Sequence, residues 1–107
     1  MLINGVHHAR ELLTISQVAY NMMAILHGYE HNRNDLRALL ETSALVFIPL
    51  VNPDGVYYID EAYKRTHRWE YIRKNRHIYP DMHYCKDAED QGVDLNRNYP
   101  HMFKHDD

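Results

Sequence analysis

Residues 44–51, with the sequence ALVFIPLV, form an unbroken apolar run of strand length. A strand that is apolar at every position is typical of a parallel sheet covered by helices on both faces. This run therefore predicts a strand that is buried on both sides. A second apolar stretch, residues 2–6 (LINGV), stands near the start of the sequence and predicts another strand.

The residues between these two strands favour helices. From Leu12 onward, apolar side chains recur at steps of three and four residues, which predicts an amphipathic helix ending near Gly28. A shorter helix is expected after Asn34, which can cap it. Strand, helix and strand in this order imply a right-handed crossover between parallel strands. The predicted fold class is therefore α/β, part of a mostly parallel mixed sheet flanked by helices.

The remaining sequence predicts less regular structure. Residues 52–55 (NPDG) predict a turn, because proline restricts φ and glycine supplies a left-handed position. Beyond Gly55 the periodicity weakens, and we expect loops with one short helix at residues 60–65. With 107 residues, the chain is long enough for one domain at most.

Composition excludes several classes of protein. No apolar run approaches the ~18 residues of a membrane span, and the single Cys85 excludes an internal disulfide framework and a four-thiolate zinc module. Basic and aromatic residues alternate over residues 63–79, a pattern that suits single-stranded nucleic acid. However, the net charge is −3 and no nucleic-acid-binding motif is present, so neither a nucleic acid nor a membrane is expected as a partner.

One chemistry-bearing motif follows the first predicted strand, at residues 5–11 (GVHHARE). Ligands of open parallel sheets bind at the carboxyl ends of the strands. His8 and Glu11 are three residues apart, so a turn entering a helix can direct both inward, and they amount to two ligands of a His₂Glu zinc site. Taken alone, the same spacing also suits a solvated helix start, where Glu11 faces the positive end of the helix dipole.

Two further motifs carry cations and amides. In residues 92–98 (GVDLNRN), Arg97 offers a guanidinium fork to a carboxylate, Asn96 adds a donor, and Asp94 can accept from a metal-bound histidine. In residues 73–76 (RKNR), Arg73 is a cation able to stabilise the oxyanion formed when water attacks a carbonyl. Taken alone, the first of these motifs also suits an ordinary polar loop, and the second a solvated basic surface.

The motifs HARE, NPDG, RKNR and GVDLNRNY occur here in that order. The series, over residues 2–99, resembles the zinc carboxypeptidase family typified by carboxypeptidase A. The resemblance implies that His8 and Glu11 are the first two zinc ligands, with His7 an alternative that the spacing disfavours. It also implies that Arg10, Asn96 and Arg97 bind the substrate, the last two through the C-terminal carboxylate of a peptide. It further implies that Arg73 stabilises the oxyanion and that Asp94 orients the zinc histidine.

The resemblance also implies missing parts. The family's third zinc ligand, its general-base Glu and its substrate-capping Tyr lie downstream of the segment matched here, and His101 and His105 do not match them. Residues 1–107 are therefore expected to be a partial peptidase domain, truncated at both ends and inactive in isolation.

The predicted function is zinc-dependent hydrolysis of the C-terminal peptide bond of peptides or proteins through a metal-activated water. One alternative is a non-catalytic relative that binds peptide C-termini. Another is an aspartoacylase-like zinc deacylase, which shares His-x-x-Glu and Asp-Leu-Asn-Arg segments, although Arg10, NPDG and Arg73 favour the carboxypeptidase. Because the family is commonly secreted, an extracellular location fits the resemblance.

Overall fold

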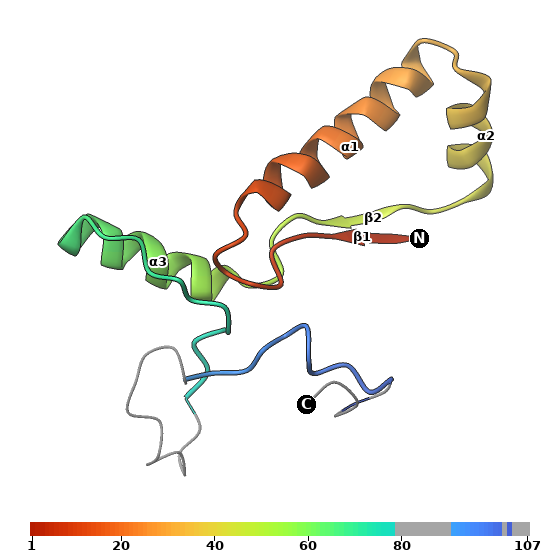
Figure 1. Ribbon diagram of the computed structural model, residues 1–107. Coiled ribbons are helices and arrows are strands. Elements are labelled where there is room, and N and C mark those ends of the chain that lie inside the picture. Colours follow the sequence, from red (N-terminus) through yellow and green to blue (C-terminus); the bar gives the residue numbers. More distant parts are fainter. Residues whose placement is uncertain (79–90, 102, 104–107) are drawn as a thin grey trace. The chain divides into compact units, whose positions relative to one another are not determined.

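A computed structural model describes residues 1–78, 91–101 and 103. The elements follow in the order β1 (Leu2–Asn4), α1 (Leu13–Glu30), α2 (Asn34–Thr42), β2 (Val46–Ile48) and α3 (Pro53–Thr66) (Figure 1). They belong to two compact units, the first formed by residues 1–5 and 13–51 and the second by residues 6–12 and 52–107. Cys85 and His105 lie outside the described residues.

The first unit contains a parallel pair of strands, as predicted. Leu2 lies opposite Val46, Ile3 opposite Phe47 and Asn4 opposite Ile48, so β1 and β2 run in the same direction. The combination of helices with parallel strands confirms the α/β class. Both strands are shorter than the apolar runs that contain them, and β2 ends just before Pro49, a residue without an N–H for the ladder.

The prediction that β2 is buried on both faces was wrong. Successive side chains of a strand point to opposite faces, and Phe47 is half-buried whereas Val46 and Ile48 are 52% and 41% exposed. Leu2, which pairs with Val46, is also exposed. Among the described residues, one face of the strand pair is therefore covered only in part and the other is open.

The two helices of this unit pack through a glycine. A Cβ at Gly28 would lie 2.2 Å from Cδ1 of Leu36, so the absence of a side chain lets α2 approach α1 closely. The predicted cap of α2 was wrong, because Asn34 is the first helical residue and Arg33 precedes it without a side-chain cap. Within the described ranges, no helix has the length and apolar character needed to span a bilayer.

The second unit is built on α3, which is much longer than the predicted helix at residues 60–65. Its core consists of Ala9, Ile59 and Ile72, each at most 1% exposed, with Val56 and Tyr58 packed against it. The core thus joins α3 to the segment just after β1 and to the segment before the RKNR motif.

The NPDG motif starts this helix and does not form the predicted turn. Asn52 is the N-cap, Pro53 occupies the first helical position, and Gly55 lies inside the helix. Glycine is required at position 55 by contact and not by φ, since a Cβ there would lie 2.6 Å from Cβ of Ala9 and 2.9 Å from the Lys74 carbonyl oxygen. The motif therefore combines a helix cap with a close helix contact.

Candidate metal centre

Asn52 joins three segments of the second unit. Its side chain is 1% exposed, and Oδ1 accepts from the Gly55 amide at 3.0 Å, which caps α3. Its Nδ2 donates to the carbonyl oxygens of His7 at 3.1 Å and Arg73 at 3.5 Å. Sequence reasoning missed this role, although an Asn directly before a Pro at a helix start is an N-cap pattern.

The side chain of His8 lies between two carboxylates. His8 is 7% exposed, and its Nδ1 lies 2.9 Å from Oε1 of Glu11. On the opposite side of the ring, Nε2 lies 3.2 Å from Oδ1 of Asp94 but is not aligned for a hydrogen bond with it. The Glu11 amide donates to the His8 carbonyl oxygen at 3.0 Å, and this turn holds the two side chains on one side, as the spacing predicted.

Asp94 connects His8 to Arg73. Its Oδ2 accepts from Nε of Arg73 at 2.5 Å, and its Oδ1 accepts from the Asn96 amide at 2.9 Å. Partial burial of Asp94 opposes ionisation, but the Arg73 guanidinium and the Asn96 amide outweigh it and hold the pKa of this carboxyl below its ordinary value. A stable negative charge therefore faces the imidazole of His8.

Backbone pairing explains why Arg73 reaches Asp94. The Asn75 amide donates to the Val93 carbonyl oxygen at 3.0 Å, and the Val93 amide donates to Oδ1 of Asn75 at 2.8 Å. Gly92 has a φ of 89°, and a Cβ there would lie 1.9 Å from the Asn75 carbonyl oxygen, so only glycine fits. On the other side, the Ala9 amide donates to the Arg73 carbonyl oxygen at 3.2 Å. These contacts place the RKNR segment beside both the HARE and the GVDLNRN motifs.

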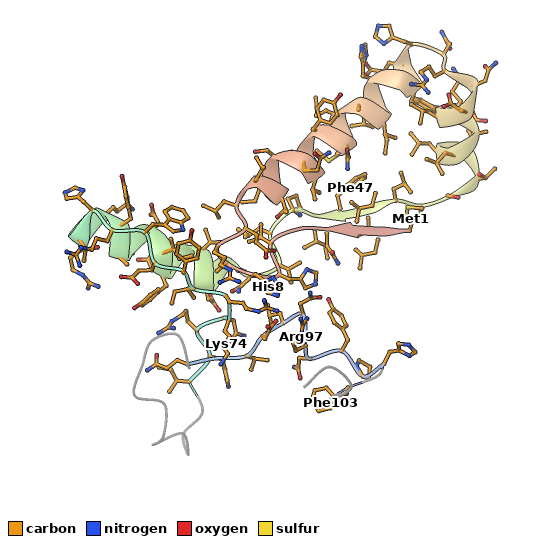
Figure 2. All side chains as sticks on the ribbon, in the orientation of Figure 1. Met1, His8, Phe47, Lys74, Arg97 and Phe103 are labelled. Carbon is orange, nitrogen blue, oxygen red and sulfur yellow. The ribbon has the colours of Figure 1, made fainter. Side chains whose placement is uncertain are left out.

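The three predicted substrate-binding residues lie at the edge of this arrangement. Asn96 and Arg97 are exposed on the loop that carries Asp94, and the Arg97 amide donates to the Asp94 carbonyl oxygen at 3.0 Å. Figure 2 shows Arg97 on this loop. Arg10 lies over the ring of Tyr71, 5.9 Å from its centroid. The contacts described above link His8, Glu11, Asp94 and Arg73 into one chain, which does not include the side chains of these three residues.

His7 has a different partner from His8. Its Nε2 lies 2.6 Å from the hydroxyl oxygen of Tyr99, and the two rings are tilted against each other with centroids 5.8 Å apart. The contact with Glu11 belongs to His8, and the choice of His8 over His7 as a zinc ligand stays a prediction. Sequence reasoning missed Tyr99, since a pairing across 92 residues leaves no local pattern.

Comparison with known protein families shows which family the chain belongs to. The sequence model of the zinc carboxypeptidase family matches residues 1–106. The chain belongs to the zinc carboxypeptidase family. This membership confirms the resemblance drawn from the four motifs, and no solved structure matches the chain.

Curated relatives of the family carry two kinds of name. The inactive metallocarboxypeptidase ECM14 of Arthroderma otae is 35% identical over 99 residues, which are 92% of this chain and 14% of that protein. The metallocarboxypeptidase A of the same organism is 32% identical over 103 residues, which are 96% of this chain and 21% of that protein. The metallocarboxypeptidase A of Trichophyton rubrum is 31% identical over 103 residues, which are 96% of this chain and 21% of that protein. The chain thus spans about a fifth or less of the relatives it matches.

The donor set around His8 fits part of the zinc site that the family implies. An imidazole nitrogen and a carboxylate oxygen are ligands that zinc prefers, and here they already face each other. A zinc ion held by both atoms would need Nδ1 of His8 to be unprotonated, with the ring proton on Nε2. Among the described residues, no group of three or more His, Cys, Asp or Glu side chains is placed to hold a metal ion.

Proposed function

We propose that this chain supplies part of the catalytic site of a zinc-dependent carboxypeptidase, which hydrolyses the C-terminal peptide bond of peptides or proteins. The observation that carries the proposal is the position of His8, with Nδ1 facing Glu11 and Nε2 facing Asp94. Membership of the zinc carboxypeptidase family supports it.

In this proposal, Nδ1 of His8 and a carboxylate oxygen of Glu11 hold the zinc. When bound, zinc polarises a carbonyl group and lowers the pKa of a water molecule. Asp94 faces Nε2 and favours the tautomer with the proton on that nitrogen, so that Nδ1 keeps its lone pair for the metal. The lowered pKa of Asp94 keeps the carboxylate ionised for this task at neutral pH.

Arg73 is proposed to stabilise the oxyanion that develops on the scissile carbonyl. Its side chain is 33% exposed, so a substrate can reach it. A guanidinium has five N–H donors, and the Nε contact with Asp94 uses one of them. Because Asp94 holds the guanidinium in place beforehand, little reorganisation is needed when the negative charge forms.

Asn96, Arg97 and Arg10 are proposed to bind the peptide. Asn96 and Arg97 are exposed and adjacent, and an arginine fork with a neighbouring amide matches the two oxygens of a C-terminal carboxylate. Both follow Asp94 directly in the chain, so a peptide held by them would lie near the carboxylate that orients His8.

A chimera tests the proposal, with this chain replacing the 103 matched residues of the metallocarboxypeptidase A of Arthroderma otae. We expect zinc-dependent release of the C-terminal residue from a peptide. His8→Ala should abolish this release, whereas His101→Ala, which changes an exposed histidine of the same unit, should leave it intact. Equal activity of the two variants would refute the assignment.

The name of the inactive relative supports one alternative, a non-catalytic protein that binds peptide C-termini. In that case the chimera would bind a peptide with a free C-terminal carboxylate and not its amidated form, and would release no residue. Arg97→Ala should weaken such binding.

A further inference from the structure

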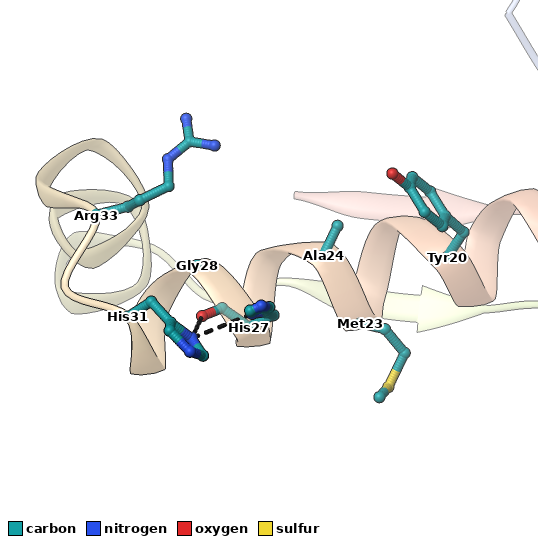
Figure 3. Close-up of a pocket in the computed structure, with 7 residues that line it drawn as sticks. All are labelled: Tyr20, Met23, Ala24, His27, Gly28, His31 and Arg33. Atoms are coloured by element: carbon teal, nitrogen blue, oxygen red, sulfur yellow. Dashed lines mark hydrogen bonds between the residues drawn. The ribbon is translucent and has the colours of Figure 1, made fainter.

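Two histidines lie one turn apart at the end of α1, in the first unit and outside the candidate metal centre. Nδ1 of His27 is 3.1 Å from Nδ1 of His31, and the ring centroids are 3.9 Å apart. Figure 3 shows both rings projecting from the same side of the helix end. Both residues are exposed, so an ion can reach them from solvent.

We propose that His27 and His31 form a second metal site, which binds a divalent transition-metal ion, Cu²⁺ most tightly, through two imidazole nitrogens. Imidazole is a good ligand for copper, nickel and zinc, and Cu²⁺ binds most strongly among the divalent ions of that series. Two nitrogens that each bind one ion at about 2.1 Å lie no more than about 4.2 Å apart. The separation of 3.1 Å satisfies this limit without any change in the helix.

The hydrogen bonds of the pair identify the atom that the metal displaces. Nδ1 of His31 lies 2.8 Å from the His27 carbonyl oxygen, which can only accept, so this nitrogen carries a proton. The same proton faces Nδ1 of His27, which therefore holds a lone pair. A metal ion binding both Nδ1 atoms takes the place of this proton, which moves to Nε2 of the neutral His31 ring.

The electrostatic surroundings favour a cation at this position. α1 ends at Glu30, and the dipole of a helix places partial negative charge at its C-terminus. The nearby cation Arg33 is paired with Asp35, its Nη2 lying 2.7 Å from Oδ2, which offsets its repulsion. The pair borders a hollow of about 550 Å³, which has room for further small ligands and is also lined by Tyr20, Met23 and Arg33.

Two ligands four residues apart, one in the last turn of α1 and one just after it, give a site whose affinity depends on their spacing. Once one imidazole binds the ion, the second is already one helical turn away, which raises its effective concentration. Binding therefore requires the turn from His27 to His31, whose amide and carbonyl groups are hydrogen-bonded, to be formed, and the ion stabilises that turn in return. A change in spacing should weaken the site even where both histidines remain.

Titration of the full chain with Cu²⁺ tests this inference, with the helical circular-dichroism signal and the paramagnetic broadening of NMR signals as readouts. The matched control carries both His31→Asn and Asn32→His, which keeps the composition but moves one imidazole to position 32, five residues from His27 and at the left-handed φ of 59°. We expect the control and His27→Asn to bind Cu²⁺ at least about tenfold more weakly at α1. The metal-induced gain in helical signal should be lost in both.

His8→Ala separates this site from the candidate zinc centre, because it removes a ligand there and should leave Cu²⁺ binding at α1 unchanged. The inference is overturned if the spacing control binds Cu²⁺ as tightly as the unaltered chain with the same gain in helical signal. It is also overturned if broadening spares His27 and His31 at one equivalent of Cu²⁺.

Discussion

Replacing Asn52 by Asp tests what holds the candidate metal centre together. Asp and Asn are equally good N-caps, so Asn52→Asp keeps an oxygen for the Gly55 amide and preserves the start of α3. The substitution replaces Nδ2, which donates to the His7 carbonyl oxygen at 3.1 Å, with an oxygen that cannot donate. The change therefore removes the link between α3 and the HARE segment and leaves the cap in place.

The expected loss follows from the contacts of Asn52. Asn52→Ala removes the cap, at about 1 kcal/mol, and leaves the His7 carbonyl oxygen without its partner, at about 1–2 kcal/mol. The sum is about 2–3 kcal/mol in the free energy of unfolding. Asn52→Asp keeps the cap but places a charge at a side chain that is 1% exposed, opposite a carbonyl oxygen. We therefore expect Asp to destabilise at least as much as Ala does.

Urea unfolding of the chain at low micromolar concentration, followed by circular dichroism, measures these losses. Asn34→Asp is the matched control, because it makes the same chemical change at the start of α2, where Asn34 is exposed. The control should change the free energy of unfolding by less than about 0.5 kcal/mol. If Asn52→Asp were equally mild, Asn52 would be only a cap and the proposed joining of three segments would be wrong.

Three further predictions concern the candidate metal centre. The isolated chain should bind zinc weakly, because His8 and Glu11 fill only half of a tetrahedral coordination shell. Nanomolar zinc affinity in isothermal titration that survives His8→Ala and Glu11→Ala would place the site elsewhere. In the chimera, Arg73→Ala should lower kcat by about 10²–10³-fold, whereas Arg97→Ala should raise KM more than it lowers kcat. The same changes in kcat and KM for both variants would contradict these two roles. Because the pKa of Asp94 is lowered, its ion pair with Arg73 stabilises the fold above about pH 4, and this stabilisation is lost as the pH falls through the folded-state pKa of Asp94. The acid unfolding of Arg73→Ala should lack this contribution.

The sequence predicted the elements of the first unit better than their environment. The three- and four-residue spacing placed α1 within a few residues of its bounds, Leu13–Glu30, since a helix repeats its own pattern. The apolar run at residues 44–51 located β2 but wrongly predicted burial of Val46 and Ile48. An apolar side chain indicates that burial is favourable, and the covering element must come from elsewhere in the fold.

The candidate site was predicted in part by spacing and in part by resemblance. The contact between His8 and Glu11 follows from a local turn, so three-residue spacing was enough to suggest it. The contact between Arg73 and Asp94 spans 21 residues and depends on backbone pairing of Asn75 with the segment at Gly92. No local pattern carries that information, so the sequence alone gave these two residues separate roles.

The HARE and NPDG motifs are best understood as a single packing unit. Ala9 is fully buried, and the missing side chain of Gly55 leaves the space that its methyl group occupies. A larger residue at either position would push α3 away from the segment that carries His8. The cap residue Asn52 acts in the same place, because its amide binds the carbonyl oxygen of the residue before His8. Each motif is thus a steric or hydrogen-bonding condition for the other, and together they hold the backbone of the candidate zinc ligand against α3.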